Sequence, residues 1–494
     1  MHLKLRITAF VILLSIIASA LLSCSDSADS GQINDTADTA SADQTPETPD
    51  ANLTPYELRQ LISDDLPEAD FGGDPFRVAT MADKEYEIRE EEITGKNTSD
   101  AVFNRNAKIN ERFNTVIESV ILAAPYADVK THVLAGDNAY EITGFWNFKV
   151  YEPVAAGVLA SWTDVPLVNF DKPWHNKLAN DSATINNKLF AITSDLSISS
   201  LMYTYGMFFN TDIMQNFGFD SKALYDLVFN GQWTVDKFRE ITSTIYTDVN
   251  GNGKKDKDDI HGYAVVLGLN PSDVWLASLD LEVTSSESGE LKSVFYTEKS
   301  AAALEKIINL SHYGDGSFVH TGDWRDIPKM FANGTIAMTQ LYFGEAFTEL
   351  GEMDSAYGIL PIPKWDESQE HYYTNAWDQF TVFAIPETTT DFNFVGTIYE
   401  ALCAETYKTV YPEYYDVALK SRYSADPTVA QIVDIIMDGR KFEFSFQFGE
   451  TLSRLPYLFR DMLYQKDPNL ASKYTEIEKV IRKALEKVSG YYTN

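Results

Sequence analysis

The chain has 494 residues, of which 44% are hydrophobic and 13% aromatic, and this composition is typical of a globular protein long enough to form two lobes. Its 73 acidic residues exceed its 40 basic residues, which gives a formal net charge of −33. This charge argues against nucleic acid as a partner, because phosphate binding requires clustered lysine and arginine. It also disfavours long-range attraction to an anionic membrane surface.

The N-terminus has the features of an export signal. Lys4 and Arg6 precede an apolar run from Ile7 to Leu22, which is short for a membrane-spanning helix. The run ends in Leu-Leu-Ser-Cys, which resembles the lipobox of bacterial lipoproteins, where the cysteine is lipidated and becomes the new N-terminus. We therefore expect a signal peptide over residues 1–23, lipidation at Cys24, and contact with the membrane through this lipid anchor only. An ordinary signal peptide or an anchor helix is the alternative.

The segment after this cysteine is expected to be a flexible tether over residues 24–70, because its first half contains almost no apolar residues. The only other cysteine, Cys403, lies in an apolar context and is predicted to be buried. With Cys24 lipidated, no intramolecular disulfide is available. A catalytic or metal site based on cysteine is likewise excluded.

The folded part is expected to begin with a strand, a helix and a second strand. Phe76–Met81 and Thr115–Leu122 have strand patterns, and the segment between them carries a helix that ends near Phe113. This order predicts a right-handed crossover and a parallel sheet. The charged stretch Glu85–Glu92 is predicted to be an exposed loop or hairpin. No glycine-rich phosphate-binding motif follows these strands, so nucleotide binding has no support.

The stretch from Thr184 to Thr211 predicts a hinge. Ile185–Lys188 has the sequence of a tight turn, because asparagine tolerates the positive φ that such turns need. Leu189–Ile192 is then expected to be a short strand, and Leu201–Phe209 a strand that is covered on both faces. The polar elbow Thr193–Ser197 between them is interpreted as a connection between two lobes, with Asp195 near the cleft.

A second motif predicts a structural calcium ion. The loop from Asp248 to Asp259 has oxygen-bearing side chains at alternate positions, glycine at its sixth position and a carboxylate at its twelfth. Asp259 stands where glutamate is usual, which predicts weaker binding. An Asx-rich turn without metal is the alternative. The expected ligands are Asp248, Asn250, Asn252, the carbonyl of Lys254, Asp256 and Asp259.

Five further segments follow in a characteristic order. They are Lys188-Leu189-Phe190, Phe209-Asn210-Thr211, the run from Gly231 to Phe238, Phe331-Ala332-Asn333-Gly334-Thr335-Ile336-Ala337-Met338, and Tyr357-Gly358-Ile359-Leu360-Pro361-Ile362-Pro363. Together with the lipobox they resemble the extracellular solute-binding proteins of ABC importers, in particular the carbohydrate-binding branch that includes maltose-binding protein. In such proteins the last two segments are a strand of the second lobe and the return hinge.

The resemblance implies an α/β, periplasmic-binding-protein-like fold of two discontinuous lobes, which are joined by hinge crossings and close on the ligand. The first lobe would comprise residues 71–195 and 362–415, and the second residues 196–361. Residues 416–494 would form C-terminal helices, mainly of the second lobe. The calcium-like loop and the long aromatic C-terminal part depart from the family pattern, so the identity of the ligand does not carry over.

The resemblance also implies positions for ligand-binding residues. They are Asp273 and Trp275 after a strand of the second lobe, Tyr342 and Glu345 at a strand end, and Asn375, Trp377 and Asp378 after the return hinge. Aromatic faces suit the apolar C–H patches of a sugar, while carboxylates and amides bind its hydroxyls. For each aromatic residue, packing in the core is the alternative.

The resemblance implies a monomeric, non-enzymatic receptor on the outer side of the cell membrane, which delivers a sugar or oligosaccharide to an ABC permease. A lipid-anchored glycoside hydrolase is a competing interpretation and would need two carboxylates at a fixed separation of roughly 5–10 Å. A peptide-binding lipoprotein would share the same architecture. The sequence leaves both alternatives open.

Overall fold

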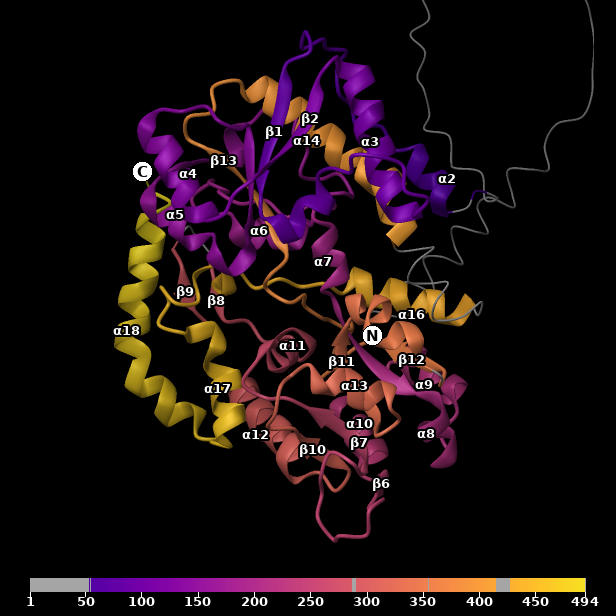
Figure 1. Ribbon diagram of the computed structural model, residues 1–494. Helices are drawn as coiled ribbons and strands as arrows, with labels where there is room; N and C mark the ends of the chain where they lie inside the picture. Colours follow the sequence, from indigo (N-terminus) through magenta and orange to yellow (C-terminus); the bar gives the residue numbers. More distant parts are fainter. Residues whose placement is uncertain (1–52, 54, 287–289, 354, 415–426, 494) are drawn as a thin grey trace, which may run out of the picture. The chain divides into compact units, whose positions relative to one another are not determined.

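Two mixed β-sheets organise the chain (Figure 1). The computed structural model describes residues 53–494 apart from residues 54, 287–289, 354, 415–426 and 494, and residues 53–494 form one compact unit. The predicted signal peptide, the lipidation at Cys24 and most of the predicted tether lie outside the described residues.

The first sheet has five strands in the order β2-β1-β3-β13-β4. β1 (Pro75–Thr80) is parallel to β2 (Val116–Ile121) and to β3 (Ile142–Trp146). β13 (Thr381–Pro386) is antiparallel to β3 and to β4 (Leu159–Ala160). Helix α3 (Asn97–Phe113) connects the parallel strands β1 and β2, so the predicted strand–helix–strand unit is confirmed.

The second sheet follows the order β10-β7-β11-β5-β12, and β6 (Tyr246–Thr247) pairs with β7. β10 (Ser317–Val319), β7 (Ile260–Val265) and β11 (Ile336–Tyr342) are parallel neighbours. β5 (Tyr205–Asn210) is antiparallel to β11 and to β12 (Tyr357–Leu360). All six residues of β5 are buried, as expected for a strand that is covered on both faces.

Helices cover both sheets. The first sheet is covered by α3, α4 (Pro125–Ala135) and α14 (Phe392–Glu405), where the buried Cys403 lies. The second is covered by α8 (Thr211–Asn216), α9 (Ser221–Phe229), α10 (Val235–Thr242), α12 (Glu298–Tyr313), α13 (Asp326–Ala332) and α16 (Pro427–Asp438). The chain ends in α17 (Leu458–Gln465) and α18 (Leu470–Gly490).

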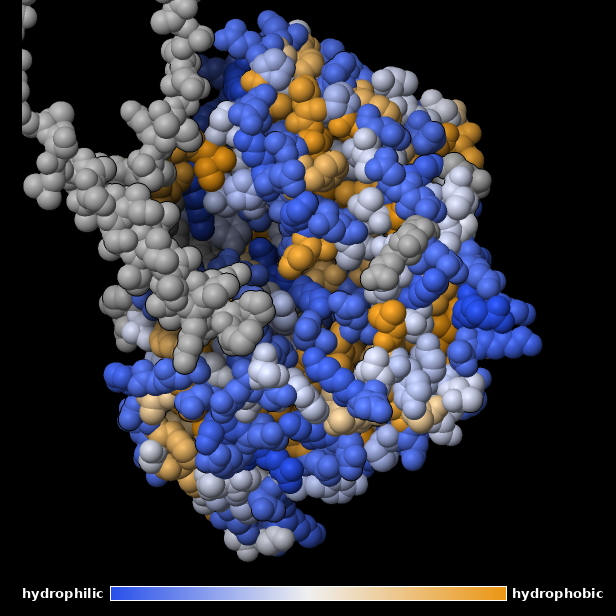
Figure 2. Space-filling model, turned by 180° about the vertical axis from the view of Figure 1, so that it is seen from behind, coloured by the Kyte–Doolittle hydropathy of each residue, from blue (hydrophilic) through white to orange (hydrophobic). Residues whose placement is uncertain are grey.

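The surface is mainly hydrophilic on the side opposite to that of Figure 1, and hydrophobic residues form separate small groups there (Figure 2). This agrees with the large net charge of the chain. Among the described helices, none combines the length and the apolar character that crossing a membrane requires.

The predicted turn at Ile185–Lys188 is confirmed, because Asn186 and Asn187 have φ values of 50° and 59° and Ile185 pairs with Lys188. The strand predicted at Leu189–Ile192 is wrong. Only Ile192 pairs there, in an isolated bridge to Phe383 of β13. The strand predicted at Leu201–Phe209 is wrong at its start, where the short helix α7 (Ile198–Met202) precedes β5. Apolar character alone did not distinguish a buried helix from a buried strand.

Among the described residues, three neighbouring segments lie between the regions of the two sheets, and we call residues 194–204, 374–380 and 439–443 the crossing segments. The first two run side by side: the amide of Trp377 donates to the carbonyl of Tyr203 (2.9 Å), and that of Tyr205 donates to the carbonyl of Asn375 (3.1 Å). The third lies beside the second, since the amide of Thr374 donates to the carbonyl of Gly439 (3.0 Å).

The return to the first sheet comes later in the chain than the Tyr357–Pro363 segment indicated. β12 is the edge strand of the second sheet, and Lys364 and Ala376 still pair with Thr234 and Thr204. The chain therefore returns between Ala376 and the start of β13. The lobe boundaries stay predictions, because residues 53–494 are one compact unit.

The prediction of an exposed loop at Glu85–Glu92 is wrong for the start of this stretch. Glu87 ends the 3₁₀ helix η1 (Ala82–Glu87) and is buried, and so is the following Ile88. The Glu87 carboxylate accepts hydrogen bonds from the amide of Ser199 (2.6 Å) and from the hydroxyl of Thr381. One donor on a crossing segment and one directly after another thus satisfy a charged residue that the local sequence places at the surface.

Candidate ligand-binding site

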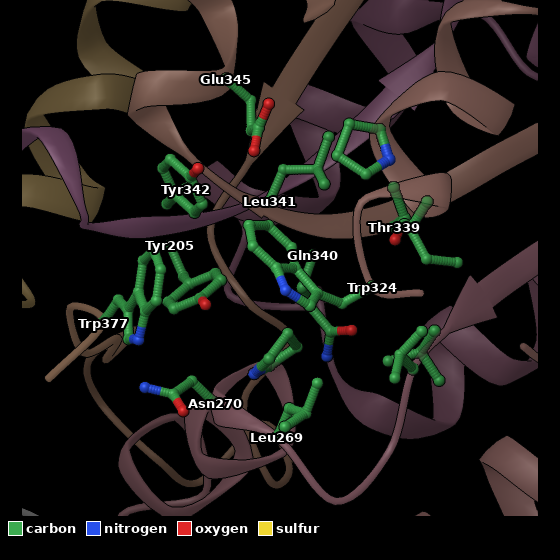
Figure 3. A pocket seen from close by; sticks show the side chains of 15 residues that line it. Tyr205, Leu269, Asn270, Trp324, Thr339, Gln340, Leu341, Tyr342, Glu345 and Trp377 are labelled. Atoms are coloured by element: carbon green, nitrogen blue, oxygen red, sulfur yellow. The ribbon is translucent and has the colours of Figure 1, made fainter. Parts of the chain in front are cut away.

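An aromatic cavity of about 110 Å³ lies where strands of the second sheet meet the crossing segments. Four rings line it: Tyr205 begins β5, Tyr342 ends β11, Trp324 precedes α13, and Trp377 lies on the second crossing segment (Figure 3). We call this space the aromatic cavity. Strand ends and the loop before a helix bring the rings together although they are far apart in the sequence.

The rings contact one another at angles that leave faces and edges available. The centroid of Trp377 lies 5.8 Å from that of Trp324 and 5.7 Å from that of Tyr342. Tyr203, on the first crossing segment, adds a further ring 5.2 Å from Trp377. Such surfaces pack well against apolar patches of a ligand.

Polar groups flank these rings. Gln340 of β11 is buried, and its carbonyl accepts a hydrogen bond from the hydroxyl of Tyr263 (2.8 Å). Its Nε2 has no hydrogen-bond partner among the described residues. In Figure 3, Glu345 and Asn270 lie on opposite sides of the rings. Burial raises the pKa of the Glu345 carboxyl, which accepts a hydrogen bond from the hydroxyl of Thr348 (2.8 Å). The cavity therefore offers both apolar faces and polar groups.

A second, more polar space adjoins this cavity, and Asn270 lines both. We call it the polar pocket. Its polar lining comes from residues distant in the sequence: Asn147 after β3, Asn270 and Asp273 of α11 (Asn270–Ser278), Asn375 and Asp378 of the second crossing segment, and Glu443 of the third.

Asp273 and Asp378 of the polar pocket belong to one network, because Arg460 Nη1 donates both to Asp273 and to Asn270 Oδ1 (3.3 Å). Arg460 of α17 donates through Nη1 to Asp273 Oδ2 (2.8 Å), and its guanidinium lies 4.0 Å from the ring centroid of Tyr457. Asn270 Nδ2 donates to Asp378 Oδ1 (2.7 Å). Burial raises the pKa of Asp273 and of Asp378. The charged form of both carboxyls is therefore disfavoured in the absence of a further cation or donor.

Six of the eight residues predicted to bind the ligand line these two spaces. Tyr342, Glu345 and Trp377 line the aromatic cavity, and Asp273, Asn375 and Asp378 line the polar pocket. Their role in binding stays a prediction.

The other two predicted residues lie elsewhere. Trp275 is fully buried, and its ring packs against Phe238 at a centroid distance of 6.5 Å. Asp195 lines a separate small cavity with Tyr411 and Tyr414, where burial raises its pKa to about 7. Trp275 thus packs in the core, which was the alternative to ligand binding, and Asp195 lies away from both spaces.

The sequence-based prediction missed Tyr205, Trp324, Asn270 and Gln340 in the aromatic cavity. Tyr205 lies in the strand predicted to be covered on both faces, where a packing role was the natural interpretation, and Gln340 lies just after the segment that ends at Met338. Asn270 had a signal, because it begins a helix directly after a buried strand. Arg460 lies 187 positions from Asp273, and no local pattern connects the two.

The calcium-like loop is folded by hydrogen bonds of its own. Asp248 Oδ1 accepts from the amide of Gly251 (2.7 Å), and its Oδ2 accepts from that of Gly253 (2.8 Å). Asp259 is fully buried and accepts from the amides of Val249 and Asp256 (both 3.1 Å). In the part of the chain that is described, no group of three histidine, cysteine or acidic side chains is placed to hold a metal ion. The predicted calcium ligands therefore stay a prediction.

Comparison with known proteins shows the fold. No protein-family model matches the chain, and no curated protein matches its sequence. A family 1 extracellular solute-binding protein from Bifidobacterium longum subsp. infantis is similar in structure, with a TM-score of 0.51 and 12% sequence identity over 85% of this chain and 99% of that one. An ABC substrate-binding protein from Listeria monocytogenes, in complex with cycloalternan, has a TM-score of 0.50 and 12% identity over 85% of this chain and 98% of that one.

These likenesses confirm the predicted fold class. The chain has the α/β fold of extracellular solute-binding proteins of ABC transporters, with two mixed sheets joined by crossing segments. At 12% identity the likeness concerns the fold, and the ligand has to be argued from the site itself.

Proposed function

We propose that this protein is an extracytoplasmic receptor that binds a sugar or oligosaccharide and delivers it to an ABC permease. The observation that carries the proposal is the aromatic cavity, which joins the polar pocket at the crossing segments. Tryptophan and tyrosine faces would contact the C–H patches of a pyranose ring, while amides and carboxylates would bind its hydroxyls.

Gln340 supports a ligand rich in hydroxyl groups. Its buried Nε2 lacks a partner among the described residues and belongs to a residue that lines the aromatic cavity. An unsatisfied buried donor costs free energy, which a ligand oxygen would recover on binding. The backbone around Gln340 is fixed by the ladder between β11 and β5, so this donor is held in position before the ligand arrives.

The location of the rings supports hinge closure. Trp377 and Tyr203 lie on crossing segments that hydrogen-bond to each other, so a ligand on these rings contacts the connection between the two sheets directly. Contacts that are better in a closed arrangement would shift the protein towards it. The closed receptor would then be recognised by the permease.

The remaining parts of the proposal concern the context of the receptor. The N-terminal sequence supports export and attachment through lipidated Cys24, with the receptor acting as a monomer outside the cell membrane. The names of the two similar structures are those of binding proteins, which favours a receptor over the glycoside hydrolase. The second of them holds an oligosaccharide, which favours a sugar over a peptide.

A calorimetric titration of the exported chain with mono- and oligosaccharides and with oligopeptides tests the proposal. We expect saturable binding of at least one sugar, no turnover of it, and at least 10-fold weaker binding by Trp324→Ala. Tyr313→Ala is the matched control, because Tyr313 is an exposed ring outside both spaces. Hydrolysis of a bound oligosaccharide would favour the enzyme, and binding of peptides alone would favour the peptide receptor.

We further propose that Asp248, Asn250, Asn252, the Lys254 carbonyl, Asp256 and Asp259 hold a structural calcium ion. The donors are all oxygens, as this cation prefers, and the ion would supply rigidity to the loop before β7. Binding to the folded state alone raises stability by about 2.7 kcal/mol at a calcium concentration 100 times the Kd.

Thermal unfolding with calcium, with magnesium and with a chelator tests the calcium site. We expect a higher Tm in calcium only, and loss of this increase in Asp248→Ala. Equal Tm values in calcium and in chelator would show that the loop is an Asx-rich turn without metal.

A further inference from the structure

We propose that the polar pocket receives a protonated amine of the ligand, so that the solute is an amino sugar, or an oligosaccharide with a free amino group. This inference rests on the proposed function and specifies the class of sugar. Three features of the pocket support it: an unpartnered acceptor, an excess of carboxyl groups over cationic groups in its lining, and the adjoining aromatic faces.

The first feature is an acceptor without a donor. Asp273 is only 3% exposed and lines the polar pocket. Its Oδ2 accepts the hydrogen bond from Arg460, but its Oδ1 has no hydrogen-bond partner among the described residues. A carboxylate oxygen only accepts hydrogen bonds, so the group that completes this site has to be a donor.

The second feature is the charge of the pocket. Three carboxyl groups line it, those of Asp273, Asp378 and Glu443, and no lysine, arginine or histidine is among its described lining residues. The nearest guanidinium, that of Arg460, is paired with Asp273. Lys441, two residues before Glu443, is paired with Asp280 (2.8 Å).

The other two carboxylates have neutral partners. Asp378 accepts a hydrogen bond from the side-chain amide of Asn270 (2.7 Å). Glu443 accepts from the hydroxyl of Thr284 (2.7 Å) and from the amide of Val283 (3.2 Å). Neutral donors satisfy hydrogen bonds but do not neutralise charge, so ionisation of all three carboxyls would leave the pocket with a net negative charge that a ligand cation would offset.

The charge distinguishes an amine from a hydroxyl. A ligand hydroxyl would donate one hydrogen bond to Asp273 and leave the charge of the pocket unchanged. An ammonium group has three donors and one positive charge, so it can bond to Asp273 and Asp378 and also offset their burial. Burial raises the pKa of both carboxyls, and a bound cation would favour their ionised forms again.

The third feature is the position of the pocket next to the rings. Asn270 lines both spaces, so a ring in the aromatic cavity can extend a substituent into the polar pocket. A sugar ring with an amino substituent thus combines the two chemistries that the adjoining spaces provide.

Matched sugars test the inference by calorimetry on the full exported chain, at a pH where the amine is protonated. The panel contains glucose, galactose and mannose, their 2-amino and 2-acetamido forms, and the β-1,4-linked trimers of glucose, glucosamine and N-acetylglucosamine. Putrescine is included as an amine without a sugar. We expect the free-amine form to bind at least 10-fold more tightly than its neutral and acetylated counterparts.

Variants assign the preference to the pocket. Asp273→Asn and Asp378→Asn each remove one carboxylate while keeping the shape of the side chain, and each should lower the affinity for the amino sugar about 10-fold. The affinity for the neutral counterpart should change less than twofold. Asp323→Asn is the matched control, because its carboxylate lies beside Trp324 in the chain but pairs with Arg325 outside the pocket. It should leave the ratio of the two affinities unchanged.

Each outcome decides the inference. Neutral sugars that bind as tightly as the amino sugars, or more tightly, would overturn the inference of an amine site and leave the proposed sugar receptor standing. An equal loss of both affinities in the two variants would do the same. Binding of putrescine but of no sugar, lost in Asp273→Asn, would keep the amine pocket and overturn the sugar function. Binding of nothing in the panel would overturn both. Should Asp273→Asn fail to fold because Arg460 loses its partner, Asp378→Asn decides alone.

Discussion

The aromatic cavity and the polar pocket share Asn270 but are built in different ways. The aromatic cavity is mainly a property of the second sheet, because Tyr205, Gln340 and Tyr342 lie at or near strand ends. The polar pocket collects side chains from both sheet regions and from two crossing segments. We infer that the cavity supplies most of the affinity and that the pocket, which depends on how the two sheets meet, supplies selectivity.

The largest effect is expected from loosening the crossing segments. Glu87→Leu would remove the acceptor for the Ser199 amide and the Thr381 hydroxyl, which lie at the first crossing segment and at the start of β13. Leaving buried donors unpaired at a former charge site costs about 3 kcal/mol. Urea unfolding should show this loss. Glu90→Leu is the control, since Glu90 belongs to the same charged stretch but is not fully buried.

The ligand preference of Glu87→Leu is a second measurement, and it tests the difference between the two spaces. If the polar pocket depends on the crossing segments, the variant should lose its preference for an amino sugar more than its affinity for a neutral one. An equal loss of both would mean that the two spaces respond to the crossing segments as one site, which contradicts the distinction drawn above.

A smaller effect is expected in the aromatic cavity. Trp324→Ala removes one face that lines the cavity and contacts Trp377. The loss of a central aromatic contact costs about 2 kcal/mol, or roughly 30-fold in Kd. Calorimetry should show this loss equally for neutral and for amino sugars. A selective loss for the amino sugar would place the cation on the ring and not in the polar pocket.

The smallest effect is expected at the polar edge of the aromatic cavity. Gln340→Met removes the unpartnered Nε2 donor and should weaken binding of a neutral sugar about 10-fold, which corresponds to ~1.4 kcal/mol. Thr335→Val is the control, because Thr335 precedes the same strand and its hydroxyl bonds to the carbonyl of Met330 away from the cavity. Unchanged affinity in Gln340→Met would remove this amide from the binding site.

The sequence contained most of the information for local structure. Hydrophobic periodicity predicted the unit β1-α3-β2, and the asparagine pair predicted the turn at residues 186 and 187, because both depend on neighbours along the chain. It did not predict that Glu87 is buried, since the partners of this carboxylate lie 112 and 294 positions away. Charge in a short segment indicates exposure only where no distant donor compensates it.

The candidate site was likewise predicted in part. Tyr342 and Trp377 were found from motifs at a strand end and beyond the return segment, and both line the aromatic cavity. Trp275 was assigned to the cleft by the same kind of motif but faces the core, because residues of one short helix point in different directions. Trp324 had no motif of its own, and only the folding of its loop against the crossing segments reveals it.

The most direct test of the account is a crystal structure of the full exported chain grown with the tightest-binding sugar of the panel. The account predicts a sugar ring against Trp324 and Trp377, with an amino substituent within hydrogen-bond distance of Asp273 Oδ1. A ligand bound elsewhere, with the aromatic cavity filled by the protein's own side chains, would contradict it.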